Sequence, residues 1–230
     1  MLERIEWSKL YESWGVTTDA LERAYSPARL LEILVRFLPS NATARVLELG
    51  CAPGRWLGWA RTRLGVTGIG IELDQRGAEL TKQLYKFLLL IRGDAACLPL
   101  ADECCDATFS IGLLEHFDDP RPILLESGRV LRDRGICITA MPNIAAGTFH
   151  RWHWETFQKR FLAAHHPYTL AELEQTVSSA GFEIIHAEHN GIYIPHLQRV
   201  MGRLPFRGLL RRLEHPLMAA NLVVVAQKRG

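Results

Sequence analysis

The 230-residue sequence has no long hydrophobic run, no marked excess of either charge and only five cysteines. No apolar stretch approaches the roughly 20 residues that span a bilayer, and the tightest apolar cluster, Phe87–Ile91, has the length of a strand. The net charge of +2 does not by itself favour nucleic acid or an anionic surface as a partner. Acidic residues lie within Met1–Glu6, where a secretory signal would be apolar. We therefore expect a soluble, cytoplasmic protein with one well-packed domain.

The cysteines have neither the number nor the spacing of a disulfide framework, because five is odd and no C-x-x-C pair occurs. Cys97, Cys104 and Cys105 are close in sequence, but adjacent cysteines on a strand or turn point apart, and their spacing differs from that of usual zinc ligands. We expect reduced thiols in an intracellular protein and no zinc site.

The sequence also lacks the glycine motifs of two nucleotide-binding loops. G-x-G-x-x-G would need three glycines, whereas Gly50–Arg55 reads GCAPGR, and no Gly-Lys-Ser/Thr follows. The segment Val46–Gly54, VLELGCAPG, is instead an apolar run that carries Glu48 and then breaks into small residues. It predicts a buried strand, a tight loop and a helix N-terminus, where a ligand can approach backbone N–H groups. Glu48 would repel a pyrophosphate but suits the ammonium of an amino-acid moiety.

Strand-like and helix-like segments alternate along much of the chain, which is typical of an α/β fold with a parallel sheet and helices on both faces. The predicted strands are Arg45–Gly50, Thr67–Glu72, Phe87–Arg92, Asp106–Gly112, Gly135–Met141, Phe182–Glu188 and Asn221–Gln227. The predicted helices are Arg55–Leu64, Gln75–Leu84, Pro122–Arg132, which Gly135 is expected to cap, and a helix that starts at the Thr169–Glu172 capping box and ends at Gly181.

The remaining segments suggest how the domain is organised. Residues 1–44 predict an N-terminal helical cap, and residues 45–230 the main domain with two insertions, at about 145–166 and 192–217. Because these insertions follow strands, we expect them to form a lid over a substrate. The helical spacing of Phe149, His153, Phe157 and Phe161 in the first insertion also allows a plainer interpretation, a helix whose aromatic face packs on the sheet.

Acidic residues follow three predicted strands. Open α/β sheets bind ligands beyond the carboxyl ends of their strands, where Glu48, Glu72 and Asp94 would lie. Glu72, some twenty residues after the loop, could accept hydrogen bonds from a ribose diol, and Asp94 from an exocyclic amine. The sequence therefore predicts a nucleoside pocket.

With these motifs in order, the chain resembles the class I S-adenosylmethionine-dependent methyltransferases of the type 11/12 group, which includes small-molecule O-methyltransferases of quinone biosynthesis. The resemblance implies a Rossmann-like, doubly wound, seven-stranded, mostly parallel sheet with an antiparallel last strand, and S-adenosyl-L-methionine as cofactor. The motifs that carry it are VLELGCAPG (46–54), GIELD (70–74), GDAACLPL (93–100), FSIGLLEHFDDP (109–120), RVLRDRGICITAMPN (129–143) and PYTLAELEQTVSSAGF (167–182).

The resemblance also implies a role for each matched residue. It places the methionine ammonium on Glu48, the ribose hydroxyls on Glu72 and the adenine N6 on Asp94, and it places Arg29 on the cofactor carboxylate. The other residues that it assigns to the cofactor are Gly50, Cys51 and Gly54 at the amino-acid end, Leu73 and Ala95 at the adenine, and Ile111 and Leu113 beside the sulfonium.

The chain departs from its relatives at two positions. Ala52 replaces the central glycine of the usual G-x-G-x-G loop. Some relatives bind a metal through Glu-x-x-Glu-His after the fourth strand, but Gly112 stands here at the first of these positions, so no metal is predicted.

The resemblance predicts methyl transfer to a small-molecule oxygen or nitrogen nucleophile, which requires alignment, exclusion of water and a base. His116, His150 and His153 are the candidate bases, although His116 could equally hydrogen-bond a loop. No Asn/Asp-Pro-Pro-Tyr motif follows the fourth strand, which disfavours methylation of a base or amide nitrogen of that kind.

Other functions stay open at this point. The domain could bind the cofactor without transferring a methyl group, or it could modify RNA or protein, because arginines and aromatics interleave near the C-terminus. Near-neutral charge and the lack of an added RNA-binding domain disfavour a nucleic-acid partner. The arginine-bearing segment 199–212 could also contact a membrane surface.

Overall fold

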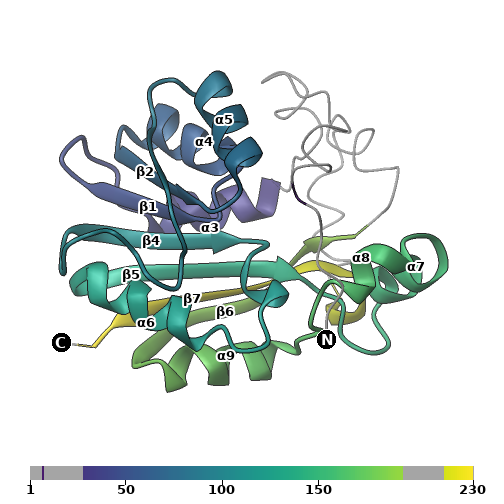
Figure 1. The fold of residues 1–230 in the computed structure, drawn as a ribbon. Helices are drawn as coiled ribbons and strands as arrows, with labels where there is room; N and C mark the ends of the chain where they lie inside the picture. Colours follow the sequence, from purple (N-terminus) through teal and green to yellow (C-terminus); the bar gives the residue numbers. More distant parts are fainter. Residues whose placement is uncertain (1–6, 8–27, 194–214, 230) are drawn as a thin grey trace.

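The computed structural model describes Trp7, residues 28–193 and residues 215–229 (Figure 1). Most of the predicted N-terminal cap and the arginine-bearing segment 199–212 lie outside these residues. The part of the cap that is described contains α3 (Ala28–Phe37). No helix in the described part of the chain is both long and apolar enough to cross a bilayer.

A single sheet of seven strands has the order β3-β2-β1-β4-β5-β7-β6. Six strands run in one direction, and β7 is antiparallel to both of its neighbours. The predicted doubly wound sheet with an antiparallel last strand is therefore confirmed. The strands are β1 (Arg45–Leu49), β2 (Thr67–Glu72), β3 (Leu89–Arg92), β4 (Cys105–Ile111), β5 (Leu131–Pro142), β6 (Phe182–Ile192) and β7 (Ala219–Lys228).

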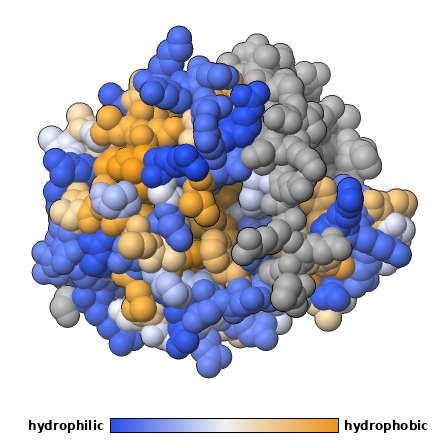
Figure 2. All heavy atoms as spheres, in the orientation of Figure 1, coloured by the Kyte–Doolittle hydropathy of each residue, from blue (hydrophilic) through white to orange (hydrophobic). Residues whose placement is uncertain are grey.

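Helices cover both faces of the sheet (Figure 1). Side chains alternate along each strand, so Val46 of β1 joins an apolar cluster with α3 and α4, whereas Leu47 joins a second cluster with α6 and α9. The helices are α4 (Arg55–Leu64), α5 (Gln75–Leu84), α6 (Arg121–Val130), α7 (Phe149–Phe157), α8 (Lys159–Ala163) and α9 (Leu170–Ser179), with short 3-10 turns η1 (Leu114–His116) and η3 (Pro216–Met218). Apolar residues also reach the surface of the molecule. In the view of Figure 2, they gather on the side where β1 and β2 lie.

Glycine and polar capping residues account for the helix boundaries that the sequence predicts well. Gly54 and Gly65 flank α4 in left-handed conformations, and Asp74 accepts a hydrogen bond from the Gly77 amide at the start of α5. The predicted capping box of α9 is present, with Thr169 and Glu172 each bonding the other's backbone amide.

The predicted boundary between α6 and β5 was wrong. The helix ends at Val130 rather than Arg132, and Gly135 does not cap it, because β5 already begins at Leu131. Leu131 pairs with Cys105, and the register then shifts, so that Ile136 pairs with Ala107. The intervening residues form an irregular segment in which Arg134 has a φ of 60°. This segment is a β-bulge, and its position depends on the pairing of β5 with β4. The residue pattern of β5 alone therefore does not predict it.

The first insertion is helical, as its spacing predicted, but its buried face was predicted incorrectly. His150, His153 and Trp154 are the buried residues of α7, whereas Phe157 is 68% exposed. The aromatic spacing of 149, 153 and 157 therefore does not mark the packed face.

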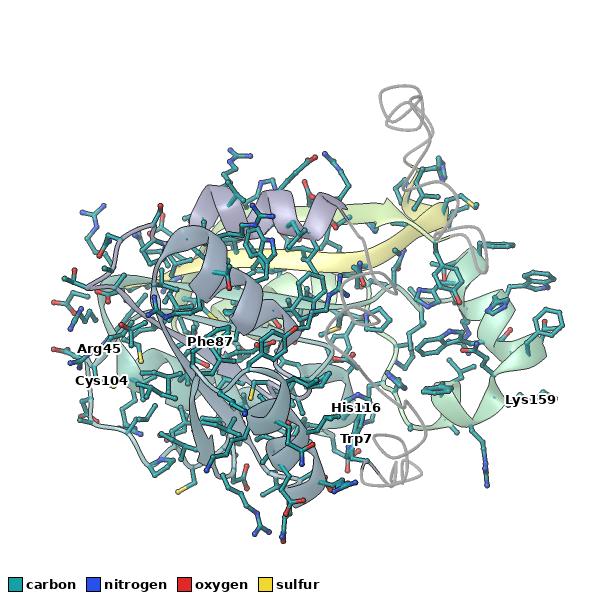
Figure 3. The ribbon with its side chains drawn as sticks, turned by 90° about the horizontal axis from the view of Figure 1, so that it is seen from above. Trp7, Arg45, Phe87, Cys104, His116 and Lys159 are labelled. Carbon is teal, nitrogen blue, oxygen red and sulfur yellow. The ribbon has the colours of Figure 1, made fainter. Side chains whose placement is uncertain are left out.

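The carboxyl ends of the parallel strands lie at one end of the sheet. In Figure 3, Arg45 and Cys104 mark the opposite end, where β1 and β4 begin, and His116 lies with Trp7 beyond the end of β4. The functional site is built at the His116 end.

Candidate functional site

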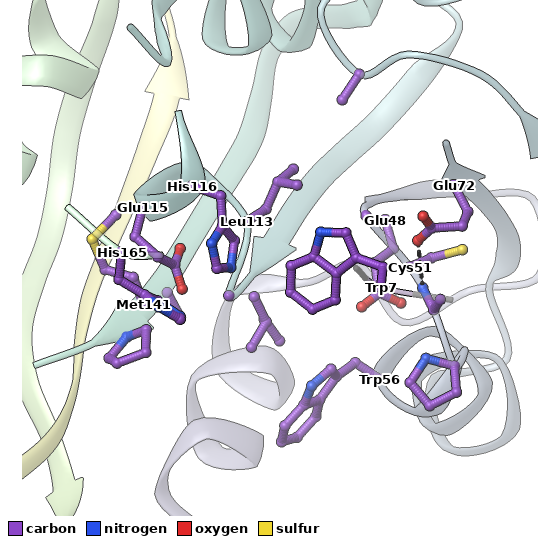
Figure 4. Close-up of a pocket in the computed structure, with 18 of the residues that line it drawn as sticks. Trp7, Glu48, Cys51, Trp56, Glu72, Leu113, Glu115, His116, Met141 and His165 are labelled. Atoms are coloured by element: carbon purple, nitrogen blue, oxygen red, sulfur yellow. Dashed lines mark hydrogen bonds between the residues drawn. The ribbon is translucent and has the colours of Figure 1, made fainter. Parts of the chain in front are cut away.

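A cavity of about 940 Å³ lies beyond the carboxyl ends of β1, β2, β4 and β5 (Figure 4). The strand order reverses between β1 and β4, and such a reversal opens a crevice for a ligand in doubly wound sheets. One part of the cavity is lined by acidic strand ends and the Gly50–Arg55 loop, and another by histidines and aromatic side chains.

The Gly50–Gly54 loop is held tightly between β1 and α4. Gly50 has a φ of +66°, and an added Cβ would lie 2.8 Å from Leu113 Cδ1, so glycine brings the loop against the turn after β4. The Cys51 amide donates to the Ile71 carbonyl at 3.0 Å. Gly54 does not line the cavity. A Cβ added to Gly54 would point toward α5 and would lie 2.6 Å from Thr81 Cγ2. Its glycine identity thus serves the packing of α4 against α5.

Glu48 is buried at the end of β1, where it is 2% exposed. Its Oε2 accepts a hydrogen bond from the Leu57 amide at 2.9 Å, in the first turn of α4. Burial raises the pKa of Glu48 well above its ordinary value, and the nearby Glu72 carboxyl adds to this rise. A cationic group in the cavity would stabilise the ionised form.

Glu72 joins the loop to the end of β2 through both carboxylate oxygens. Oε2 accepts from the Ala52 amide at 3.1 Å, and Oε1 accepts from the Asp74 amide at 2.9 Å. Burial raises the pKa of Glu72, although these backbone hydrogen bonds oppose the rise. Each oxygen keeps a second lone pair that could accept from a ligand hydroxyl.

The end of β3 contributes a more exposed part of the cavity wall. Asp94 Oδ1 accepts a hydrogen bond from the Ala96 amide at 2.9 Å, which orients this exposed carboxylate on the cavity wall, and the adjacent Ala95 is buried. Leu73, next to Glu72, is 62% exposed and offers an apolar surface beside these acids.

Glu115, His116 and His165 form a compact group at the other part of the cavity (Figure 4). Glu115 is 1% exposed, and neither carboxylate oxygen has a hydrogen-bond partner among the described residues. Burial raises the pKa of Glu115 to about 8. His116 Nδ1 lies 2.9 Å from the Ala164 carbonyl, and Trp7 packs edge-on against its ring with centroids 5.0 Å apart.

The tautomers of the two histidines follow from their partners. A carbonyl oxygen can only accept, so Nδ1 of His116 and Nδ1 of His165, which bonds the Phe161 carbonyl, each carry a proton. Burial lowers the pKa of His116, although the carbonyls of Ala164 and Gly112 oppose this, and burial lowers that of His165 to about 4. Both rings are therefore neutral near pH 7.

His150 and His153 on α7 have different surroundings. His150 lines the cavity, its Nδ1 donates to the Ala220 carbonyl at 3.1 Å, and its ring stacks on Tyr193 with centroids 3.5 Å apart. Burial lowers the pKa of His150 to about 3. His153 does not line the cavity, because it packs behind Tyr193, whose hydroxyl lies 2.9 Å from its Nδ1.

Most of the predicted site residues meet in this one cavity, and three do not. Arg29 on α3 is paired with Glu32 at 3.0 Å and, like Gly54 and His153, is not part of the wall. The predicted residues that do line it are Glu48, Gly50, Cys51, Glu72, Leu73, Asp94, Ala95, Ile111, Leu113, His116 and His150.

Sequence reasoning missed part of the wall. Trp7, Trp154, His165 and Tyr193 line the cavity from segments far apart in the chain. The concentration of aromatics and histidines at 149–166 was a signal for Trp154 and His165, but no local motif indicates Trp7 or Tyr193. Figure 4 shows the indole of Trp7 between His116 and the carboxylates of Glu48 and Glu72.

This sheet order, the antiparallel β7 and a cavity with acids at successive strand ends define the class I methyltransferase fold. Residues 47–139 match the family model described as a methyltransferase domain. The chain is thus similar to class I S-adenosylmethionine-dependent methyltransferases, in sequence over these residues and in fold over the whole sheet.

Curated relatives are similar in sequence, and solved structures are similar in fold. The chain is 28% identical over 155 residues to a protein of Mycolicibacterium smegmatis named as a probable S-adenosylmethionine-dependent methyltransferase, covering 66% of this chain and 58% of that protein. It is 30% identical over 121 residues to an O-methyltransferase of Pyrenophora dematioidea, covering 50% of this chain and 45% of that protein. The matches thus span about half the length of these relatives.

One similar structure comes from a complex between the Haloferax volcanii Trm112 methyltransferase activator and a methyltransferase. It has a TM-score of 0.75 at 18% identity and covers 99% of this chain and 100% of that one. Phosphoethanolamine N-methyltransferase 2 of Haemonchus contortus, solved with S-adenosyl-L-methionine, has a TM-score of 0.64 at 18% identity and covers 87% of this chain and 52% of that one. At such identities, the likeness concerns the fold.

Proposed function

We propose that this chain transfers the methyl group of S-adenosylmethionine to a small-molecule acceptor with an oxygen or nitrogen nucleophile. The observation that carries the proposal is that Glu48, Glu72 and Asp94, from three successive strand ends, line one cavity together with the Gly50–Gly54 loop. Each acid suits a different part of this cofactor.

The side chains around the loop would hold the cofactor. Glu48 lies deepest and would bind the ammonium, since a buried carboxylate gains most from a cationic partner. Glu72 has lone pairs for the ribose hydroxyls, and Asp94 and Ala95 lie where an adenine edge would be bound. Ile111 and Leu113 would lie beside the sulfonium. The cofactor, when bound, supplies an electrophilic methyl group.

The second part of the cavity would receive the acceptor. Its walls include Trp154, Phe161 and Tyr193, which favour a flat or apolar body. α7 and α8 contribute His150, Trp154 and Phe161 to this wall, which supports the prediction that the first insertion belongs to a substrate lid. Closing the site against water would favour transfer to the acceptor over hydrolysis.

His116 is the best-placed candidate base of the three histidines. Because its Nδ1 proton is committed to the Ala164 carbonyl, Nε2 of the neutral ring can take the proton that an acceptor loses. His150 also lines the cavity, but its low pKa and its stacking on Tyr193 make it a poorer base. His153 lies behind Tyr193, which leaves it a packing role.

A labelled-transfer assay tests the proposed function. The full chain would be incubated with S-adenosylmethionine carrying a tritiated methyl group and with separate panels of phenols, alcohols, carboxylic acids and amines. We expect label in a small extractable product, and much less label with His116→Asn than with the buried control His153→Asn. Cofactor binding with no transfer across the panels and a cell-derived metabolite pool would overturn the proposal in favour of a binding module.

A further inference from the structure

The Glu115–His116–His165 group has a composition that neither cofactor binding nor a single base explains. Each residue offers one ligand atom, and these three atoms lie within 4.8 Å of one another. The rings of His116 and His165 have centroids 4.3 Å apart. Among the residues that the structure describes, this is the one group of three or more histidine, cysteine and acidic side chains so arranged.

The two histidines are oriented as metal-binding histidines usually are. Each donates its Nδ1 proton to a backbone carbonyl, His116 to Ala164 and His165 to Phe161. This hydrogen bond fixes the ring orientation and leaves Nε2 without a proton. Histidines that bind metals usually make such a hydrogen bond through the ring nitrogen that does not bind the metal.

Glu115 provides an independent indication of a missing partner. Its carboxylate is 1% exposed, and both oxygens lack a hydrogen-bond partner among the described residues. Burying a carboxyl group without donors is costly, and native proteins rarely leave such a group unpaired. The neighbouring Nε2 atoms do not donate, so no described side chain supplies the proton or cation that an ionised Glu115 would need.

We propose that Glu115, His116 and His165 bind a divalent transition-metal ion, with Zn²⁺ and Mn²⁺ as its simplest representatives. Two imidazole nitrogens and one carboxylate oxygen suit such ions, whereas Mg²⁺ and Ca²⁺ prefer oxygen ligands. The absence of a glutamate at Gly112 led us to expect no metal. The structure replaces that missing ligand with His165, which reaches the group from beyond α8.

The proposed ion would face the cavity. All three residues line it, so positions not taken by protein would point toward the acceptor part. Three protein ligands with an open position are typical of metals that bind a substrate or water rather than of purely structural metals. An ion bound here would occupy Nε2 of His116, so a water held by the ion, rather than the imidazole ring, would then take the proton that the acceptor loses. The metal site itself does not depend on the chain being an active methyltransferase.

Calorimetry on the full chain tests the metal site without an acceptor. After treatment with a chelator, the protein would be titrated with Zn²⁺ alone and with Mn²⁺ alone. We expect one equivalent of at least one ion to bind, and Glu115→Gln or His165→Asn to weaken binding by about tenfold or more, by analogy with the effects of losing even outer contacts. His166→Asn is the matched control, because His166 is adjacent in sequence but bonds Asp118 at 2.9 Å.

A second measurement guards against an unfolded variant. Far-UV circular dichroism would establish that each variant is folded, and Co²⁺ added to the folded wild-type chain should give visible absorption bands that Zn²⁺ displaces. The proposal is overturned if the wild-type chain binds neither Zn²⁺ nor Mn²⁺ stoichiometrically. It is equally overturned if folded Glu115→Gln and His165→Asn variants bind the ion as tightly as His166→Asn does.

Discussion

Oε2 of Glu72 accepts a hydrogen bond from the backbone amide of Ala52 at 3.1 Å, and this contact joins the end of β2 to the loop that follows β1. The other oxygen of the same carboxylate accepts from the Asp74 amide, so the side chain is fixed before any ligand arrives. A carboxylate held in this way can receive ligand hydroxyls with little loss of side-chain entropy. Glu72 therefore shapes the cavity and also serves as part of its binding surface.

Replacing Gly50 with alanine should damage the site more than the same change at Gly65. Both glycines have positive φ, +66° and +74°, so both variants share a backbone cost of about 1–2 kcal/mol. At Gly50 the new Cβ would also lie 2.8 Å from Leu113 Cδ1, whereas at Gly65 it meets no heavy atom within 4 Å. We expect Gly50→Ala to lose about 1 kcal/mol more in unfolding free energy, measured with denaturant, because the end of the Leu113 side chain must shift, and to bind S-adenosylhomocysteine more weakly. Equal losses in the two variants would contradict the tight loop–turn contact.

Glu48→Gln should separate ligand binding from stability. The pKa of Glu48 is raised in the folded state, so its contribution to stability is present below the unfolded pKa and is lost as pH rises through the folded pKa. Glutamine keeps an oxygen for the Leu57 amide and does not titrate. Relative to wild type, the variant should gain unfolding free energy between pH 5 and pH 8, while its affinity for S-adenosylmethionine falls. A variant that loses stability at pH 8 and keeps its affinity would refute the assigned role.

His150→Asn should flatten the acid side of the stability profile. Burial lowers the folded pKa to about 3 from an ordinary 6.5, so the unfolded chain takes up a proton first. Stability from this group is complete above pH 6.5 and is lost as pH falls toward 3, with a slope of up to about 1.4 kcal/mol per pH unit. Asparagine can keep a donor for the Ala220 carbonyl without titrating, although it loses the stack on Tyr193. Denaturant unfolding at pH 4.5 and pH 7 should give a smaller pH difference for the variant, and an unchanged difference would exclude a buried, neutral His150.

The parts of the fold that local residues determine could be predicted from the sequence. β2, α4 and α5 have the predicted bounds, because glycines and Asp74 mark their ends. The strand-end acids Glu48, Glu72 and Asp94 could be placed as well, since parallel strands in a doubly wound sheet end at the same edge.

The parts that depend on distant contacts could not be predicted. The bulge in β5 depends on its pairing with β4, and the burial of His150 depends on Tyr193 and Ala220. His165 meets Glu115 only because α7 and α8 return the chain to the end of β4. The spacing of residues within one segment does not predict a contact between segments that lie so far apart in the sequence.

The central claim is that the cavity at the strand ends holds S-adenosylmethionine, and calorimetric titration with this cofactor tests it most directly. The wild-type chain should bind one equivalent. Glu72→Ala should bind at least about tenfold more weakly, because charge-assisted hydrogen bonds to the ligand and the contact with the loop are lost. Glu79→Ala, on the exposed side of α5, should match wild type. No binding to the wild-type chain, or equal affinity in a folded Glu72→Ala variant, would contradict the account.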